Sequence, residues 1–153
     1  MKIEFVKAKL SDIEDMQRLV QPEVESGVIL VRSSDEIATN IRSYILAKNE
    51  DELVGFCALH IHAASLAEIR SLIVKESYRG QGVGVNLVSK ALDEAKFFNI
   101  QKVLTLTYRQ SFFEQLGFVE IPKESIPEHK IWADCIKCKH FPICNEVSLI
   151  KII

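Results

Sequence analysis

The sequence predicts an α+β fold in which a central mixed β-sheet is flanked by helices. Apolar runs on either side of residues 49–52 are typical of an antiparallel hairpin. A strand, a glycine-rich turn, a long amphipathic helix and a buried strand then follow one another over residues 69–107. Because a strand–helix–strand connection joins parallel strands, we expect a mixed sheet with helices on both faces.

The first part of the chain is expected to form one strand and two helices. Residues 3–8 have the apolar residues of a strand. Ser11-Asp12-Ile13-Glu14 matches a capping box and opens a helix, which Pro22 and Gly27 are expected to end or loosen. Ser33-Ser34-Asp35-Glu36 is a second capping box and predicts another helix.

The remainder of the chain alternates strands with helices. The hairpin strands are expected at residues 44–48 and 53–61, a further strand at 67–74, and the long helix at 85–99, where apolar residues recur at helical spacing. A strand, a short helix and two strands are expected in that order at residues 103–107, 111–116, 118–121 and 147–153. Gly117 is placed to end the short helix.

Size and charge restrict the class of protein. A chain of 153 residues is expected to fold as a single domain, residues 1–153. The formal net charge of −2 argues against a nucleic-acid partner. The charged N-terminus does not match a signal peptide, and no apolar run reaches the roughly 18 residues of a membrane span, so we expect a cytoplasmic protein without a membrane partner. The sequence leaves the oligomeric state open, and a homodimer is compatible with it.

The segment Tyr78-Arg79-Gly80-Gln81-Gly82-Val83-Gly84 predicts a site for a phosphorylated ligand. A strand–turn–helix order leaves unpaired N–H groups at a helix N-terminus, where the helix dipole also favours an anion. The glycines remove side chains that would keep a phosphate away from these groups. No lysine follows Gly84, which excludes a Walker loop, and the spacing differs from the dinucleotide fingerprint. The alternative is a turn that only caps the helix.

Arg79-x-x-Gly82-x-Gly84 resembles the Arg/Gln-x-x-Gly-x-Gly/Ala loop of the GNAT N-acetyltransferase superfamily, and the order of elements matches the GNAT fold over essentially the whole chain. The resemblance implies acetyl-CoA as cosubstrate. In the family, the strand before the loop splays from its neighbour and its backbone pairs with the pantetheine arm. The implied cofactor-binding residues are therefore Leu72, Ile73, Val74, Arg79, Gly80, Gln81, Gly82, Val83 and Gly84.

The resemblance also implies catalytic residues. Glu68 is the expected general base, because several family members have a glutamate at the matching place. Strand alternation puts Arg70 on the same face, where it could hold a substrate carboxylate. The alternative is a surface ion pair between the two side chains. The family's usual tyrosine acid in a Tyr-x-x-x-Gly-Phe motif is Phe113 here, so Tyr108 is the nearest substitute by sequence, unless it only closes the end of its strand.

Several stretches resemble the short, single-domain N-acetylglutamate synthases, namely those around Arg32, at residues 68–72 and 106–118, and in the tail. This resemblance implies acetylation of the α-amine of L-glutamate, the first step of arginine biosynthesis. Because glutamate has two carboxylates, its pocket should contain cations, and Arg32 and Arg70 are the expected substrate-binding residues. Two alternatives stay open: an acetyltransferase for another amine, such as a peptide N-terminus or a small amine, and a non-catalytic module that binds acyl-CoA.

Three of the four cysteines lie at residues 129–146, in an expected insertion before the last strand. Cys135, Cys138 and Cys144 together with His140 could form a zinc site. Cysteines that pack a loop are the competing interpretation, so metal binding remains unknown. The fourth, Cys57, lies in a strand-like run and is expected to be a small buried residue.

Overall fold

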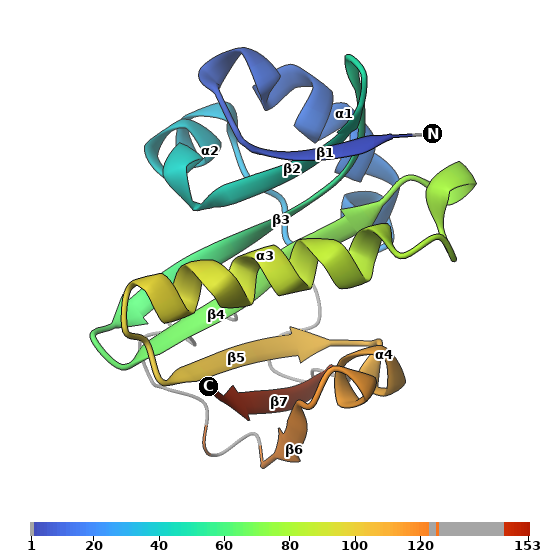
Figure 1. Ribbon diagram of the computed structural model, residues 1–153. Coiled ribbons are helices and arrows are strands. Elements are labelled where there is room, and N and C mark those ends of the chain that lie inside the picture. Colours follow the sequence, from blue (N-terminus) through green and yellow to red (C-terminus); the bar gives the residue numbers. More distant parts are fainter. Residues whose placement is uncertain (1, 123–124, 126–145) are drawn as a thin grey trace.

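The computed structural model describes residues 2–122, 125 and 146–153. Within these residues the strands form one mixed sheet flanked by helices, as predicted (Figure 1). The strand order is β1-β2-β3-β4-β5-β7-β6. The strands are β1 Ile3–Lys7, β2 Tyr44–Asn49, β3 Glu52–Ala63, β4 Leu66–Val74, β5 Lys102–Thr107, β6 Val119–Ile121 and β7 Val147–Ile152. The helices are α1 Ile13–Glu25, α2 Ser34–Thr39, α3 Val83–Phe97 and α4 Gln110–Gln115.

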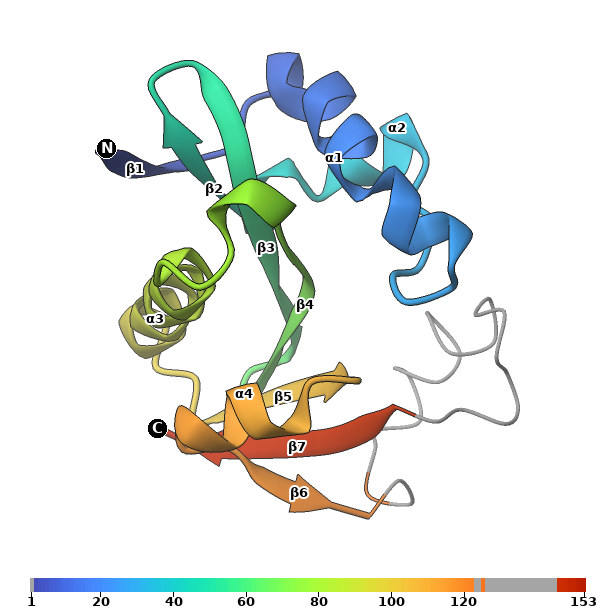
Figure 2. The ribbon, with the colours of Figure 1, turned by 90° about the vertical axis from the view of Figure 1, so that its right-hand side faces the viewer.

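The sheet opens between β4 and β5. These strands are parallel and pair only at Leu66–Glu68 with Lys102–Leu104, whereas every other pair in the described sheet is antiparallel. Figure 2 shows β5 running away from β4 beyond this short ladder. The splay that the family resemblance implied is therefore confirmed.

Helices cover the two faces of the sheet (Figure 2). On one face, α3 contributes Leu87, Val88 and Ala91 to a core cluster with residues of β2–β5. On the other face, Met16 of α1 and Ile37 of α2 are buried against side chains of β2, β3 and β4. The apolar spacing in these helices accounts for the packing, because each helix turns one apolar stripe to the sheet.

The start and end of α1 differ from the sequence-based expectation. No capping box forms at Ser11; instead the Asp12 carboxylate accepts the N–H of Lys9 at 2.8 Å. The helix also continues past Pro22 to Glu25. Pro22 lies in the last turn and is exposed, so its missing N–H removes a single hydrogen bond from the end of the helix. The second capping box, at Ser33, is confirmed.

The predicted insertion at residues 129–146 lies outside the described residues except for Glu146. The proposed metal ligands Cys135, Cys138, His140 and Cys144 all fall in that part, and metal binding there stays a prediction. In the part of the chain that the structure describes, no helix has the length and hydrophobicity needed to cross a bilayer. The cytoplasmic location stays a prediction as well.

Candidate active site

The glycine-rich segment forms a turn that ends at the N-terminus of α3. Gly80 and Gly82 have φ angles of 76° and 84°. This is a left-handed backbone conformation that residues with a Cβ rarely adopt. Asn86 is the first residue whose N–H bonds into α3, to the carbonyl of Gly82 at 3.0 Å. The N–H groups of residues 82–85 have no acceptor among the described residues. They are therefore available to an anion, as the sequence pattern predicts.

Side chains fix this turn in place. Arg79 Nε donates to the carbonyl of Val74 at 2.9 Å, and Arg79 Nη2 lies 3.3 Å from a carboxylate oxygen of Glu23 on α1. The Tyr78 hydroxyl donates to Glu52 at 3.0 Å and accepts from Asn49 Nδ2 at 3.0 Å. The turn is thus preorganised by contacts with β2, β3, β4 and α1.

Space remains beside the glycines. A Cβ added at Gly80 would meet no atom within 4 Å, and one at Gly82 would meet only Asn86 Nδ2, at 3.8 Å. At Gly84 the ring of Phe112 would lie 3.4 Å away, so this glycine lets α3 approach α4 closely. The first two glycines leave an open approach to the N–H groups, whereas the third serves packing.

β4 contains a bulge next to the predicted pantetheine-binding residues. Phe56 pairs with Ile73 and Ala58 pairs with Arg70, which leaves two β4 residues opposite Cys57. Ser71 is one of them and has a φ of 58°. Beyond Glu68, β4 makes no ladder with β5 in the described sheet. One residue farther along β4, the Thr105 hydroxyl of β5 donates to the carbonyl of Ile69 at 3.0 Å.

The side chains of Leu72, Ile73 and Val74 belong to the packed core or its edge. Their backbone lies where β4 has no strand partner on the β5 side. These residues can therefore pack their side chains in the core and still offer their backbone to a cofactor, as expected from the sequence.

Glu68 is deeply buried and lies against a histidine. Only 1% of Glu68 is exposed, and its Oε1 lies 2.9 Å from Nε2 of His62. Arg70 Nη2 donates to Nδ1 of His60 at 3.1 Å. Because Glu68 is buried, the alternative in which it belongs to a surface ion pair with Arg70 is wrong. Sequence reasoning missed both histidines, although their alternation with Ile61 in the hairpin strand before Glu68 was a usable signal.

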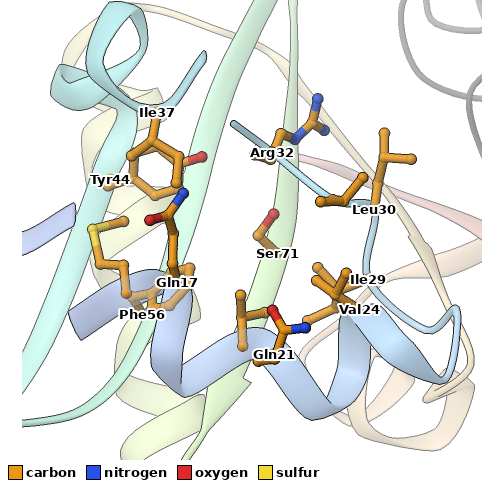
Figure 3. A pocket seen from close by; sticks show the side chains of 13 residues that line it. Gln17, Gln21, Val24, Ile29, Leu30, Arg32, Ile37, Tyr44, Phe56 and Ser71 are labelled. Carbon is orange, nitrogen blue, oxygen red and sulfur yellow. The ribbon is translucent and has the colours of Figure 1, made fainter. Parts of the chain in front are cut away.

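A pocket of about 310 Å³ lies between α1, residues 29–32 and β4 (Figure 3). Arg32 and Ser71 line it together with Gln17 and Gln21, the polar side chains of α1. The Arg32 side chain is 12% exposed and lies 3.8 Å from Glu36. The lining residues are Met16, Gln17, Val20, Gln21, Val24, Ile29, Leu30, Val31, Arg32, Ile37, Tyr44, Phe56 and Ser71.

The structure does not bring the two predicted substrate arginines together in this pocket. Arg32 lines it, whereas Arg70 does not; the β4 residue in its wall is Ser71. Glu68 and Arg70 lie farther along the same strand and contact His60 and His62 of β3. The bulge at Ser71 separates these two parts of the site.

The predicted acid, Tyr108, lies just after β5 and is 40% exposed. Its position is at the end of the strand that diverges from β4, and its role stays a prediction. Phe113 is 2% exposed, with its ring 5.1 Å from that of Phe112 and 5.2 Å from that of Phe118. The residue that replaces the usual tyrosine is thus part of an aromatic core.

Comparison with known proteins agrees with this geometry. An uncharacterized N-acetyltransferase of Chlorobaculum tepidum is 35% identical over 144 residues, which cover 94% of this chain and 92% of that protein. The amino-acid acetyltransferase of Mycobacterium tuberculosis is 29% identical over 75% of this chain and 67% of its own length.

The structure of N-acetylglutamate synthase from Neisseria gonorrhoeae, complexed with coenzyme A and N-acetyl-glutamate, matches with a TM-score of 0.88 at 22% identity. The match covers 99% of this chain and 35% of that one, and it shows a shared fold. The model of the acetyltransferase (GNAT) family matches residues 12–118. The chain therefore belongs to the acetyltransferase (GNAT) family and is an acetyl-CoA-dependent N-acetyltransferase.

Proposed function

We propose that this enzyme transfers the acetyl group of acetyl-CoA to the α-amine of an amino acid, and that the amino acid is L-glutamate. The observation that carries the proposal is the largely buried guanidinium of Arg32 in the wall of a pocket beside β4. A guanidinium matches a carboxylate in both charge and planar geometry. The names of the amino-acid acetyltransferase and N-acetylglutamate synthase relatives support the same substrate class.

In this proposal acetyl-CoA binds along the opening between β4 and β5. Its diphosphate lies in the turn at residues 79–84 and accepts hydrogen bonds from the free N–H groups at the start of α3, where the helix dipole also favours negative charge. Its pantetheine arm lies along the backbone of residues 72–74. The thioester then reaches the bulge at Ser71, next to the wall of the amino-acid pocket.

Glu68 is the proposed general base. The α-ammonium group of the amino acid gives a proton to the carboxylate, directly or through a water molecule. The neutral amine then attacks the thioester carbonyl and a C–N bond forms. The C–S bond breaks to release the coenzyme A thiolate, and the second proton that the nitrogen loses passes to solvent. Tyr108 is the proposed proton donor to that thiolate, although a thiolate is a good enough leaving group to depart without one.

Arg32 and Arg70 are the proposed ligands of the two carboxylates of glutamate. An amino acid with an uncharged side chain would offer these two arginines one carboxylate instead of two, which disfavours its binding relative to glutamate. The product would be N-acetylglutamate, which makes this reaction the first step of arginine biosynthesis.

A thiol-release assay tests the proposal. Purified enzyme is incubated with acetyl-CoA and each amino acid in turn, with a peptide N-terminus and a polyamine as comparison amines. The proposal requires the highest kcat/KM with L-glutamate. Turnover only with the comparison amines would refute the amino-acid assignment, and equal turnover with glutamate and uncharged amino acids would refute the role of the two arginines.

A further inference from the structure

Two histidines of β3 hold the two functional side chains of β4. His60 pairs with Glu68 across the antiparallel ladder, yet each histidine contacts the residue diagonal to it. His62 Nε2 is 2.9 Å from Glu68 Oε1, and Arg70 Nη2 is 3.1 Å from His60 Nδ1. Such diagonal neighbours on one face are within reach only for long side chains.

A second bulge places His62. Ile61 pairs with Ala67 and Ala63 pairs with Leu66, so His62 is an extra residue that has no ladder partner of its own. A bulge redirects the side chain of the inserted residue, and bulges are common beside active sites. The side chains of His62 and Glu68 are each only 2% exposed, so their contact is shielded from water.

The chemistry of the partners determines how each histidine is protonated. An arginine can only donate, so Nδ1 of His60 must be the acceptor and cannot carry a hydrogen. An ionised carboxylate can only accept, so Nε2 of His62 must carry one when Glu68 is ionised. The two rings meet edge to face with centroids 4.7 Å apart, which holds both orientations together.

We propose that His62 and His60 are positioning residues: His62 orients the carboxylate of the base Glu68 and keeps it supplied with a hydrogen-bond donor, and His60 orients the guanidinium of Arg70 for a substrate carboxylate. The inference rests on the proposed roles of Glu68 and Arg70. Loss of a hydrogen bond to a buried carboxylate disfavours its ionised form, and a protonated Glu68 cannot act as a base. His62 therefore acts on the chemical step, and His60 acts on amino-acid binding.

Steady-state kinetics of His62→Leu, His62→Gln and His60→Gln test this division. His62→Leu removes the donor and should lower kcat by about 100-fold, within the range that general-base catalysis contributes, while the KM values change by less than about threefold. His62→Gln retains an N–H donor near the position of Nε2 and should recover part of that loss. His60→Gln is the matched control, because it should raise the KM for the amino acid about tenfold and leave kcat within about threefold.

Thermal unfolding and coenzyme A binding establish whether each variant is folded. If His62→Leu does not fold, His62→Gln is used in its place. A kcat of His62→Leu within about threefold of the wild-type value overturns the proposal for His62. The double variant of His62→Leu and Glu68→Gln gives a second test. If its loss of kcat equals the product of the two single losses, the proposal for His62 is also overturned, because residues that act as one unit show no further loss when the second is removed. Equal effects of both histidines on kcat and KM would indicate a purely structural role and overturn the division.

Failure of the proposed function gives a different result. If the wild-type enzyme acetylates no amino acid, or if Glu68→Gln retains full activity, the role of Glu68 is refuted before the histidines are considered. If Glu68→Gln is inactive and the histidine variants behave like the wild type, only the inference about the histidines fails.

Discussion

The substitution Gly82→Trp should abolish acetyl-CoA binding and leave the protein folded. Gly82 precedes α3 with a φ of 84°, and a Cβ there meets no atom nearer than Asn86 Nδ2 at 3.8 Å. The folded state therefore has room for a larger side chain. The remaining cost is the left-handed backbone, roughly 1–2 kcal/mol for a residue with a Cβ. For a protein of this size that corresponds to a drop in Tm of about 2–8 °C.

The effect on binding should be much larger, because the indole would cover the N–H groups at the start of α3. A hydrogen bond to a charged group contributes about 1.5–3 kcal/mol. Loss of two such bonds to the diphosphate would weaken binding by about 3–6 kcal/mol, or about 10²- to 10⁴-fold. Gly82→Ala is the matched control, because it adds the same backbone strain without the bulk, and its affinity should fall by no more than about 30-fold.

Isothermal titration with coenzyme A, together with thermal unfolding of both variants, measures these quantities. Similar affinities of Gly82→Trp and Gly82→Ala would refute the assignment, because the N–H groups near residue 82 would then not contact the cofactor. A loss of folding in Gly82→Trp alone would show that the space beside Gly82 is not open as described.

Three further predictions concern the substrate pocket and the titratable groups. Arg32→Ala should raise the KM for glutamate by about 10- to 100-fold and leave the KM for acetyl-CoA unchanged. Arg18→Ala, on the exposed face of α1, is the control and should change neither KM. Equal rises in both KM values for Arg32→Ala would remove Arg32 from the amino-acid site. Burial raises the pKa of the Cys57 thiol to about 12. The thiol should therefore resist alkylation at about pH 8 in the native protein and react after denaturation, measured by peptide mapping with mass spectrometry. Rapid labelling of the native protein would contradict its burial. Burial opposes ionisation of Asp12, but the hydrogen bonds from Lys48 and from the Lys9 N–H outweigh it and hold the Asp12 pKa below its usual value of 3.8. Its contribution to stability is therefore present above that value and is lost as the pH falls through the folded-state pKa. Asp12→Asn should cost about 1–2 kcal/mol at pH 7, measured by urea unfolding, and progressively less as the pH falls below 3.8.

Features set by local spacing could be predicted from the sequence. The turn at residues 79–84 follows from three glycines between a strand and an amphipathic helix, and the structure places Gly80 and Gly82 in the left-handed conformation that this turn requires. The hairpin and the order of the elements follow from alternation and helical spacing in the same way. The N-terminus of α1 could not be predicted in this way, because Ser11 and Asp12 are both good capping residues and the tertiary contact with Lys48 favours Asp12.

Features that depend on register were not predictable in this way. Alternation puts His60 and His62 on one face of β3, but their contacts with Glu68 and Arg70 depend on the register between β3 and β4, and a one-residue shift turns a side chain to the other face of a sheet. The substrate pocket likewise joins Gln17 of α1, Arg32 and Ser71, which are far apart in the sequence. The strand pattern gave no signal for the bulge that brings Ser71 to the pocket wall.

A crystal structure with coenzyme A and N-acetyl-L-glutamate is the most direct test of the central claim. We expect the diphosphate in the turn at residues 79–84, at the free N–H groups that begin α3, and a carboxylate of the product at Arg32, with the acetylated nitrogen near Glu68. A diphosphate bound away from this turn, or a product whose carboxylates contact neither Arg32 nor Arg70, would contradict it.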